Sequence, residues 1–410
     1  MRSSSATFLS LLSLVLLSLC AVAANAQSAA SSRQPGTWTE RAQLTNTGEP
    51  GGATAVAASG NTVVVGGYVY VKPAAGWTSM TQTAILSPSD PSSAICFGCS
   101  VAIDGNTIVI GAYEANVGSN VGQGAVYVYV EPAGGWTNMT ETAKLAASDG
   151  VANQQLGHSV GVSGNTIVAG TYTSVAGATK AYAFVEPAGG WANGTQTAEL
   201  TGGGVVADLF TAWYVAIDGG TIVTTGGGLP NRAYLFTKPA GGWTNMTQTA
   251  VLNAKNQVRQ ISSGNIAING GTVVFGVPLS TEDGFTNAGT AYVFVEPAQG
   301  WMDMNPTAQL TASDQTSLAE FGVGVTVSGS SIVVGAPFAE VNSNVGQGKV
   351  YLFTEPAAGW TNMTQTAEMT ALKGETLSGL GSSVGISGAA IVAIAPRYNE
   401  YAGATYIFEQ

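Results

Sequence analysis

The stretch Gly124–Leu145, GAVYVYVEPAGGWTNMTETAKL, decides the fold because it recurs, with changes, along most of the chain. It begins with β-branched and aromatic residues over Val126–Val130, a pattern that predicts a strand. Glu131–Gly135 follows and is a predicted turn, since proline lacks a backbone donor and glycine permits positive φ. Trp136 then opens a second alternating segment, which predicts a strand that ends at Leu145.

A Pro-Ala-x-Gly-Trp signature marks six copies of this unit. The tryptophans of successive copies lie 52 to 59 residues apart, at Trp77, Trp136, Trp191, Trp243, Trp301 and Trp360. A seventh copy, Trp38–Leu44, has no strand-like run before it. A period of this size indicates a solenoid, a propeller or an array of small units.

Each period contains two further predicted strands. In the second unit these are Phe97–Ile103 and Thr107–Ala112, joined by the tight turn Asp104-Gly105-Asn106. Four strands per period is the number in a propeller blade. The chain is therefore expected to be an all-β, seven-bladed β-propeller of four-stranded blades.

The two ends of the repeat region complement each other. The last unit supplies only three predicted strands, Leu380–Ile386, Ala390–Ala395 and Ala404–Phe408, whereas Trp38–Leu44 is a strand without a unit. The N-terminal strand is thus expected to close the last blade, which removes the sheet edges of an open array. The alternative is an open β-solenoid, whose coils are shorter and need no matched leftover strands.

The first residues have the pattern of a secretory signal. Arg2 precedes the apolar run Phe8–Ala23, and Ala24-Asn25-Ala26 offers small residues for cleavage. We expect a signal peptide over residues 1–26, a flexible leader over 27–36 and the propeller over 37–410. The alternative, an uncleaved anchor, has an apolar core that is short for a span. The expected location is secreted, periplasmic or at the cell surface, without membrane insertion after cleavage.

The charge balance restricts the partners. The formal net charge is −11, and only 9% of residues are charged. An acidic, charge-poor surface argues against nucleic acid and against anionic membranes as partners. We expect a monomer that meets an extracellular protein or glycan.

The repeats also resemble a known family. Phe97-Gly98 with Gly111-Ala112, and Phe321-Gly322 with Gly335-Ala336-Pro337, are similar to the FG-GAP repeat of the integrin α-subunit propeller and its bacterial relatives. The resemblance extends over about residues 37–410. It implies a propeller that binds or adheres rather than one that catalyses.

The resemblance leaves calcium as the one cofactor to consider. Many FG-GAP repeats have an Asp-x-Asp-x-Asp-Gly loop between the first two strands. Here the corresponding turns are as short as Asp104-Gly105-Asn106 and Ser163-Gly164-Asn165. Calcium takes six to eight oxygen ligands, which such turns cannot supply. We therefore expect no metal and no cofactor.

Strand alternation places the long loops on one face, where binding residues concentrate in repeat folds. Two of these loops share the sequence Ser-Asn-Val-Gly-Gln-Gly. Their polar side chains, together with nearby tyrosines, are the candidate binding residues Glu114, Asn116, Asn120, Glu340, Asn342, Asn344, Tyr398 and Tyr401. The alternative is that the loops were duplicated for their stability, and that Tyr398 and Tyr401 simply cover them.

Residues for catalysis are sparse, so we expect no enzyme. His158 is the only histidine, which leaves no histidine metal cluster and no assured Ser-His-Asp set. Glu282-Asp283 is an adjacent acidic pair, which we interpret as solvated side chains rather than as the carboxylate pair of a glycosidase. Two alternatives remain: a carbohydrate-active enzyme, which needs a carboxylate pair at the channel mouth, and a purely structural extracellular protein.

Cys96 and Cys99 form a Cys-x-x-Cys motif that runs into a predicted strand. A redox motif would place the first cysteine at a helix N-terminus. In a secreted chain a local structural disulfide is the leading interpretation, ahead of free thiols or a metal site. Four Asn-x-Thr sequons occupy one equivalent repeat position and need no glycan to explain them: Asn138, Asn193, Asn245 and Asn362.

Overall fold

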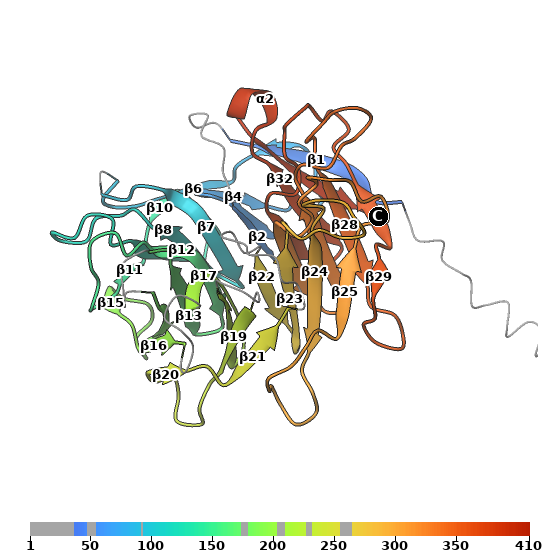
Figure 1. The fold of residues 1–410 in the computed structure, drawn as a ribbon. Coiled ribbons are helices and arrows are strands. Elements are labelled where there is room, and N and C mark those ends of the chain that lie inside the picture. The colour runs from blue at the N-terminus through green and yellow to red at the C-terminus, as the bar shows by residue number, and fades with distance from the viewer. Residues whose placement is uncertain are drawn as a thin grey trace, which may run out of the picture. The chain divides into compact units, whose positions relative to one another are not determined.

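Each sequence repeat folds into one small sheet, and seven such sheets stand in a ring (Figure 1). The computed structural model describes residues 37–46, 55–91, 93–173, 179–202, 210–226, 232–254 and 265–410. The predicted signal peptide and leader lie outside these residues. The predicted all-β, seven-bladed propeller is confirmed.

Blade 2 illustrates the plan. Its strands β7 (Phe97–Asp104), β8 (Thr107–Ala112), β9 (Ala125–Val130) and β11 (Ala143–Ala146) pair in chain order, each antiparallel to the next. The first strand borders the central channel, and the last lies at the rim.

The other blades repeat this order from channel to rim. Blade 1 contains β2 (Val56–Ser59), β3 (Thr62–Val65), β4 (Tyr68–Val71) and β6 (Ala84–Ser87); blade 3 contains β12 (Leu156–Ser163), β13 (Thr166–Thr171), β14 (Ala181–Val185) and β16 (Ala198–Thr201). Blade 4 contains β17 (Phe210–Asp218), β18 (Thr221–Gly226), β19 (Arg232–Thr237) and β21 (Ala250–Asn253); blade 5 contains β22 (Ile266–Asn269), β23 (Thr272–Val277), β24 (Thr290–Val295) and β25 (Ala308–Thr311). Blade 6 contains β26 (Gly324–Ser328), β27 (Ser331–Ala336), β28 (Lys349–Thr354) and β30 (Ala367–Met369).

Blade 7 joins the two ends of the repeat region. It consists of β31 (Val384–Ser387), β32 (Ala390–Ala395), β33 (Ala404–Glu409) and the N-terminal strand β1 (Thr39–Thr45), with the short helix α2 (Tyr398–Tyr401) between β32 and β33. Strand β1 pairs antiparallel with β33, from Thr39 opposite Glu409 to Leu44 opposite Thr405. The predicted closure by the N-terminal strand is confirmed.

The outer segments of blades 1 to 6 differ from the prediction, whereas the N-terminal copy is one continuous strand, Thr39–Thr45. Trp136–Leu145 is not one strand: Met139–Thr140 (β10) pairs in parallel with β6 of the preceding blade, and β11 begins only at Ala143. The hydroxyl of Thr142 accepts the backbone N–H of Val130 at 3.1 Å, in place of a ladder bond before the strand begins. Each outer segment therefore contacts two sheets. The equivalent two-residue strands are β5 (Met80–Thr81), β15 (Gly194–Thr195), β20 (Met246–Thr247) and β29 (Met363–Thr364).

The asparagine of each sequon has a structural role in this connection. The Oδ1 of Asn138 accepts the backbone N–H of Ile85 in the preceding blade at 2.8 Å. In blade 5 an aspartate, Asp303, accepts the N–H of Val251 in the same way. The side-chain oxygen is what the fold requires, which explains why the position recurs. The equivalent acceptors are Asn193, Asn245 and Asn362.

The hydrophobic core lies between blades rather than at the centre of the ring. Strands such as β8 and β13 are buried on both faces, so their sequences are almost continuously apolar. One cluster joins Val109 of blade 2 to Ile167 and Trp191 of blade 3. A corresponding cluster packs Leu44 of the closing strand against blade 1. Each blade therefore buries its apolar surface only when it packs against the neighbouring blades.

The repeated glycines permit close approach of neighbouring blades. A Cβ on Gly111, near the end of β8, would overlap the carbonyl oxygen of Gly157 in blade 3. Gly157 itself has φ +87°, a conformation that favours glycine. Gly335 meets Gly381 in the same manner between blades 6 and 7. The glycines of the Phe-Gly and Gly-Ala motifs are therefore fixed by packing.

Candidate functional site

The connections divide the propeller into two unlike faces. On one face, in blades 2, 5 and 6, the loop after the second strand meets the loop that enters the next blade. For example, Leu156 donates its backbone N–H to the carbonyl of Gln123 at 2.9 Å. We call this the long-loop face. The other face has the tight turns after the first and third strands, such as 104–107 and 131–135.

Two loops on this face share the sequence Ser-Asn-Val-Gly-Gln-Gly, at Ser119–Gly124 and Ser343–Gly348, and we call them the twin loops. Their own amide side chains hold them in shape. The Nδ2 of Asn120 donates to Gln123 Oε1 at 2.9 Å and to the carbonyl of Gly150 at 2.8 Å. Gln123 Nε2 in turn donates to the carbonyl of Ala147. Asn116 accepts the N–H of Gly122 at 3.0 Å. These contacts favour the interpretation that the asparagines hold the loop.

The second twin loop repeats the arrangement in blade 6. Asn344 Nδ2 donates to Gln347 Oε1 at 3.0 Å and to the carbonyl of Gly374. Asn342 is exposed and has φ +48°, a conformation that asparagine tolerates. The structure does not join the two loops into one site, because they belong to blades 2 and 6.

The other candidate residues differ in exposure. Glu114 and Glu340 are exposed on their loops. Tyr398 is half-buried, makes an edge contact with Tyr406 at 6.3 Å between ring centroids, and packs against the core between blades 6 and 7. The side chain of Tyr401 lies outside the described part of the structure.

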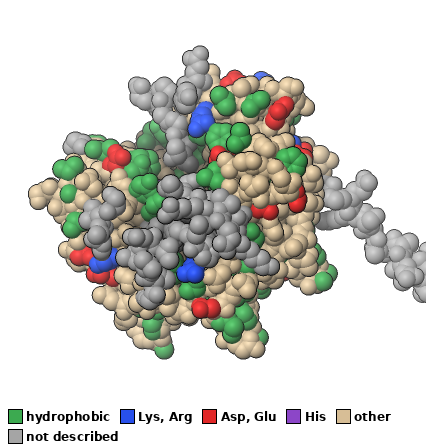
Figure 2. Space-filling model, in the orientation of Figure 1, with side chains coloured by type: hydrophobic (Ala, Val, Ile, Leu, Met, Phe, Trp, Pro, Cys, Tyr) green, Lys and Arg blue, Asp and Glu red, His purple; other side chains and the backbone are tan. Residues whose placement is uncertain are grey.

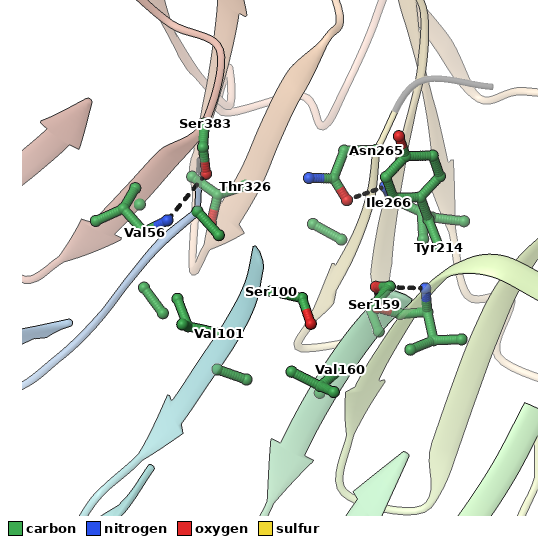
Figure 3. A pocket seen from close by; sticks show the side chains of 18 of the residues that line it. Val56, Ser100, Val101, Ser159, Val160, Tyr214, Asn265, Ile266, Thr326 and Ser383 are labelled. Carbon is green, nitrogen blue, oxygen red and sulfur yellow. Dashed lines mark hydrogen bonds between the residues drawn. The ribbon is translucent and has the colours of Figure 1, made fainter. Parts of the chain in front are cut away.

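The central channel contains a cavity of about 680 Å³ bordered by the first strand of every blade (Figure 3). Its hydroxyl groups link neighbouring blades. Ser383 accepts the N–H of Val56 at 3.2 Å, and Ser159 accepts that of Val215 at 3.1 Å. Between these links the wall is largely aliphatic, with Val101 and Val160 pointing inward. The described residues that line the cavity include no aspartate or glutamate.

An aromatic cluster borders the long-loop end of this channel. The ring of His158 stacks on Tyr172 at 4.7 Å between centroids and lies 5.3 Å from Tyr113 and 5.8 Å from Tyr214. Tyr172 also contacts Trp213 at 4.6 Å and is 41% exposed. The cluster therefore presents an aromatic surface to solvent, which could stack on the face of a sugar ring.

The histidine of this cluster is mostly buried. Its Nδ1 lies 3.1 Å from the carbonyl oxygen of Trp213. A carbonyl oxygen only accepts, so Nδ1 donates in this arrangement. Burial lowers the pKa of His158, because the charged imidazolium loses its water shell.

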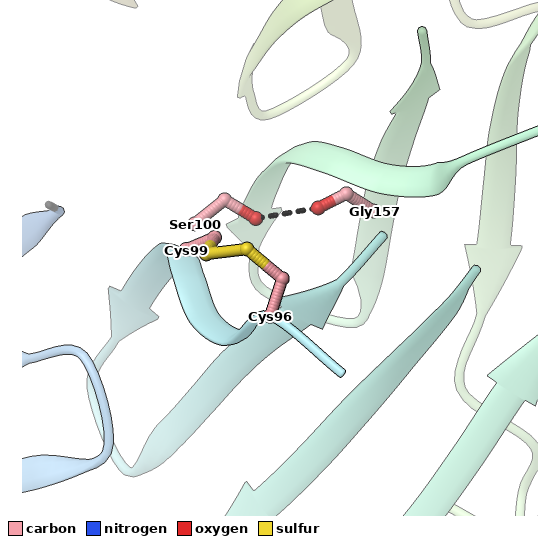
Figure 4. The surroundings of a disulfide bond; sticks show 4 residues. All are labelled: Cys96, Cys99, Ser100 and Gly157. Atoms are coloured by element: carbon pink, nitrogen blue, oxygen red, sulfur yellow. Dashed lines mark hydrogen bonds between the residues drawn. A yellow bond between two sulfur atoms is a disulfide. The ribbon is translucent and has the colours of Figure 1, made fainter. Parts of the chain in front are cut away.

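The same cavity is bordered by a disulfide. Cys96 and Cys99 are joined at the start of β7, with an S–S distance of 2.02 Å (Figure 4). The neighbouring Ser100 donates its hydroxyl to the carbonyl of Gly157 at 2.7 Å, linking blades 2 and 3. The bridge thus closes the loop from which β7 begins.

Charged side chains are sparse on the face seen in Figure 2. Within the described ranges no three His, Cys, Asp or Glu side chains form a group that could hold a metal ion. Glu282 accepts a hydrogen bond from Gln309 Nε2 at 2.9 Å. Burial raises the pKa of Glu282, and adjacent Asp283 is exposed.

In the part of the chain that the structure covers, no helix is long and apolar enough to cross a membrane.

Comparison with known proteins gives the family and the fold. The FG-GAP repeat matches residues 80–129, 139–184 and 304–353. Hydrazine synthase of Kuenenia stuttgartiensis has a similar structure, with a TM-score of 0.51 and 13% sequence identity over 88% of this chain and 97% of that chain. At this identity the likeness concerns the fold alone. No curated protein matches the chain.

Proposed function

Because the chain is an FG-GAP repeat β-propeller, we propose that it is a non-enzymatic binding protein that recognises an extracellular protein or glycan through its long-loop face. The proposal includes secretion, in keeping with the signal-like first 26 residues. The propeller supplies a rigid frame, and its variable loops are confined to one face.

The observation that carries this proposal is the exposure of apolar side chains on the long-loop face. Val121, Leu318, Val345 and Leu377 are each more than half exposed, at 64%, 59%, 57% and 51%. Exposed aliphatic groups on ordered loops favour contact with a partner. The aromatic cluster around Tyr172 is the feature that would suit a sugar ring instead.

The alternative of a carbohydrate-active enzyme has less support. Such an enzyme needs two carboxylates about 5–9 Å apart. The described lining of the channel offers none. The similarity to an enzyme, at 13% identity, carries no activity to this chain.

The test is a series of melting curves of residues 27–410 with a panel of glycans and purified extracellular proteins. A ligand that binds the folded state raises the melting temperature. Tyr172→Ala should abolish a glycan shift at the channel mouth, whereas Ala133→Ser, in a turn of the other face, should not. A shift that Ala133→Ser abolishes and the long-loop variants leave intact would contradict the proposal.

A further inference from the structure

Three loops of the long-loop face place one residue each in the same unusual position. The backbone N–H groups of Asn153, Leu318 and Leu377 donate to the carbonyls of Val121, Thr286 and Val345, at 2.8 to 2.9 Å. All three donors have left-handed backbone, with φ of +60°, +67° and +62°. They are equivalent residues in three copies of one connection, which joins blades 2 and 3, blades 5 and 6, and blades 6 and 7.

Asparagine suits this conformation, and leucine does not. Asn153 is a residue type that adopts positive φ readily, whereas a leucine there is strained. Burial does not compensate for the strain, because Leu318 and Leu377 are 59% and 51% exposed. Neither the backbone nor the core accounts for the two leucines. Residues kept in strained, exposed positions are candidates for a binding role.

The two leucines border one groove. It has a volume of about 360 Å³ and lies between the loops of blades 5, 6 and 7. Val345 and Phe338 complete its apolar wall. Arg397 lies over the Phe338 ring, 5.4 Å from its centroid.

Two carboxylates also line the groove. Glu340 is exposed and Glu320 is half-buried. Among the described residues neither carboxylate forms an ion pair within 4.0 Å, although Arg397 lies close enough to act on Glu320 through its charge. Desolvation raises the pKa of Glu320. The groove thus combines aliphatic walls with negative charge, on a chain of net charge −11.

We propose that the groove between Leu318 and Leu377 is a docking site for a protein segment that presents aliphatic side chains beside lysine or arginine. The inference rests on the proposed function and names the partner class for one part of the long-loop face. Aliphatic side chains would fill the groove, and basic groups would meet Glu320 and Glu340. A second copy of this acidic chain lacks the complementary charge.

The probe is a short, fluorescently labelled peptide of alternating leucine and lysine, whose binding to residues 27–410 is followed by anisotropy. Control peptides replace leucine by serine, or lysine by glutamate. The double variant Leu318→Asn, Leu377→Asn introduces asparagine at both positions, as Asn153 occurs in the connection from blade 2 to blade 3. It leaves the net charge unchanged and should melt at or above the wild-type temperature, because asparagine relieves the strain. Met302→Asn replaces an exposed apolar side chain beside the turn at 297–300, outside the long-loop face, and is the control.

The leucine-lysine peptide should bind the wild type and Met302→Asn equally, and the double leucine variant at least about tenfold more weakly. Both control peptides should also bind the wild type at least about tenfold more weakly. Glu320→Gln with Glu340→Gln should reduce affinity and its dependence on salt. Equal binding to wild type and double leucine variant would overturn the inference, as would wild-type dimers that this variant abolishes.

The outcome separates this inference from the proposed function. If a glycan or another protein still raises the melting temperature through the long-loop face, and the double leucine variant leaves that shift intact, only the groove assignment fails. If no glycan or protein of the panel shifts the melting temperature, the proposed function fails, whatever the peptide does at the groove.

Discussion

The carboxylate of Asp104, in the β7–β8 turn, accepts the backbone N–H of Gly164 in the next blade at 2.7 Å. Asp218 does the same for Gly270 at 2.7 Å. These turns correspond to the calcium loop that the resemblance to FG-GAP repeats led us to consider. Here their acidic groups connect successive blades. Equivalent hydrogen bonds link these turns from blade 1 to blade 6 on the face opposite the long loops.

We predict that calcium does not stabilise the protein. The turns are short, and the carboxylates of Asp104 and Asp218 already accept backbone donors. Melting temperatures of residues 27–410 with calcium and with a chelator should therefore agree. A rise with calcium, reversed by the chelator, would show that the chain holds the ion elsewhere.

Loss of one sequon asparagine should destabilise the propeller by a definite amount. Asn138→Ala removes the acceptor for the N–H of Ile85, which we expect to cost about 1 kcal/mol of unfolding free energy. Asn138→Asp keeps the acceptor, as Asp303 does in blade 5, and should be close to neutral. Denaturant titration compares the two variants. Equal losses would mean that the side-chain oxygen is not the stabilising group.

Adding a single methyl group between blades 2 and 3 should be far more damaging. Gly111→Ala would force a Cβ onto the carbonyl of Gly157, and backbone cannot move aside as a flexible side chain can. We expect a loss of about 3 kcal/mol or more. Gly134→Ala is the control, because a Cβ there meets nothing within 4 Å; it should change stability by less than about 0.5 kcal/mol. Similar stabilities for the two variants would contradict this packing.

Acid should lower the unfolding free energy of the protein through protonation of His158. Burial lowers its pKa from 6.5, so the unfolded imidazole takes up a proton at a higher pH than the folded one. The unfolded state then binds more protons, and stability falls as pH drops from about 6.5 toward the lowered pKa. The stability contribution is complete above pH 6.5. His158→Phe should lose this dependence, since the titrations of the carboxylates are common to both proteins and cancel in the comparison.

The measurement is the difference in unfolding free energy between wild type and His158→Phe, determined from pH 8 to pH 5. A constant difference across this range would show that the histidine titrates alike in both states.

The sequence predicted the blades well because the determinants are local and repeated. The strand runs, the spacing of Trp77 to Trp360 and the orphan strand Trp38–Leu44 together require a closed ring. The split of Trp136–Leu145 was missed, because its alternating pattern resembles one continuous strand. Only the partner blade shows that Met139 pairs elsewhere.

The aromatic cluster was missed for another reason. Tyr113, His158, Tyr172 and Trp213 come from three blades, and no periodicity in one segment brings them together. One signal was present in the sequence. His158, Trp213 and Cys99 occupy the same position of their blades, just before the regular pairing of the first strand with the second begins. Comparison of that single position across the repeats could have located the channel mouth.

The most direct test of the central claim, that the long-loop face binds the ligand, is hydrogen exchange with and without the panel member that raises the melting temperature most. Slower exchange should appear in at least one of the long-loop segments 113–123, 172–173, 316–320, 338–347 and 375–379, with the turns at 104–106 and 132–135 unchanged. Slower exchange confined to those turns, with the loops unaffected, would contradict the claim.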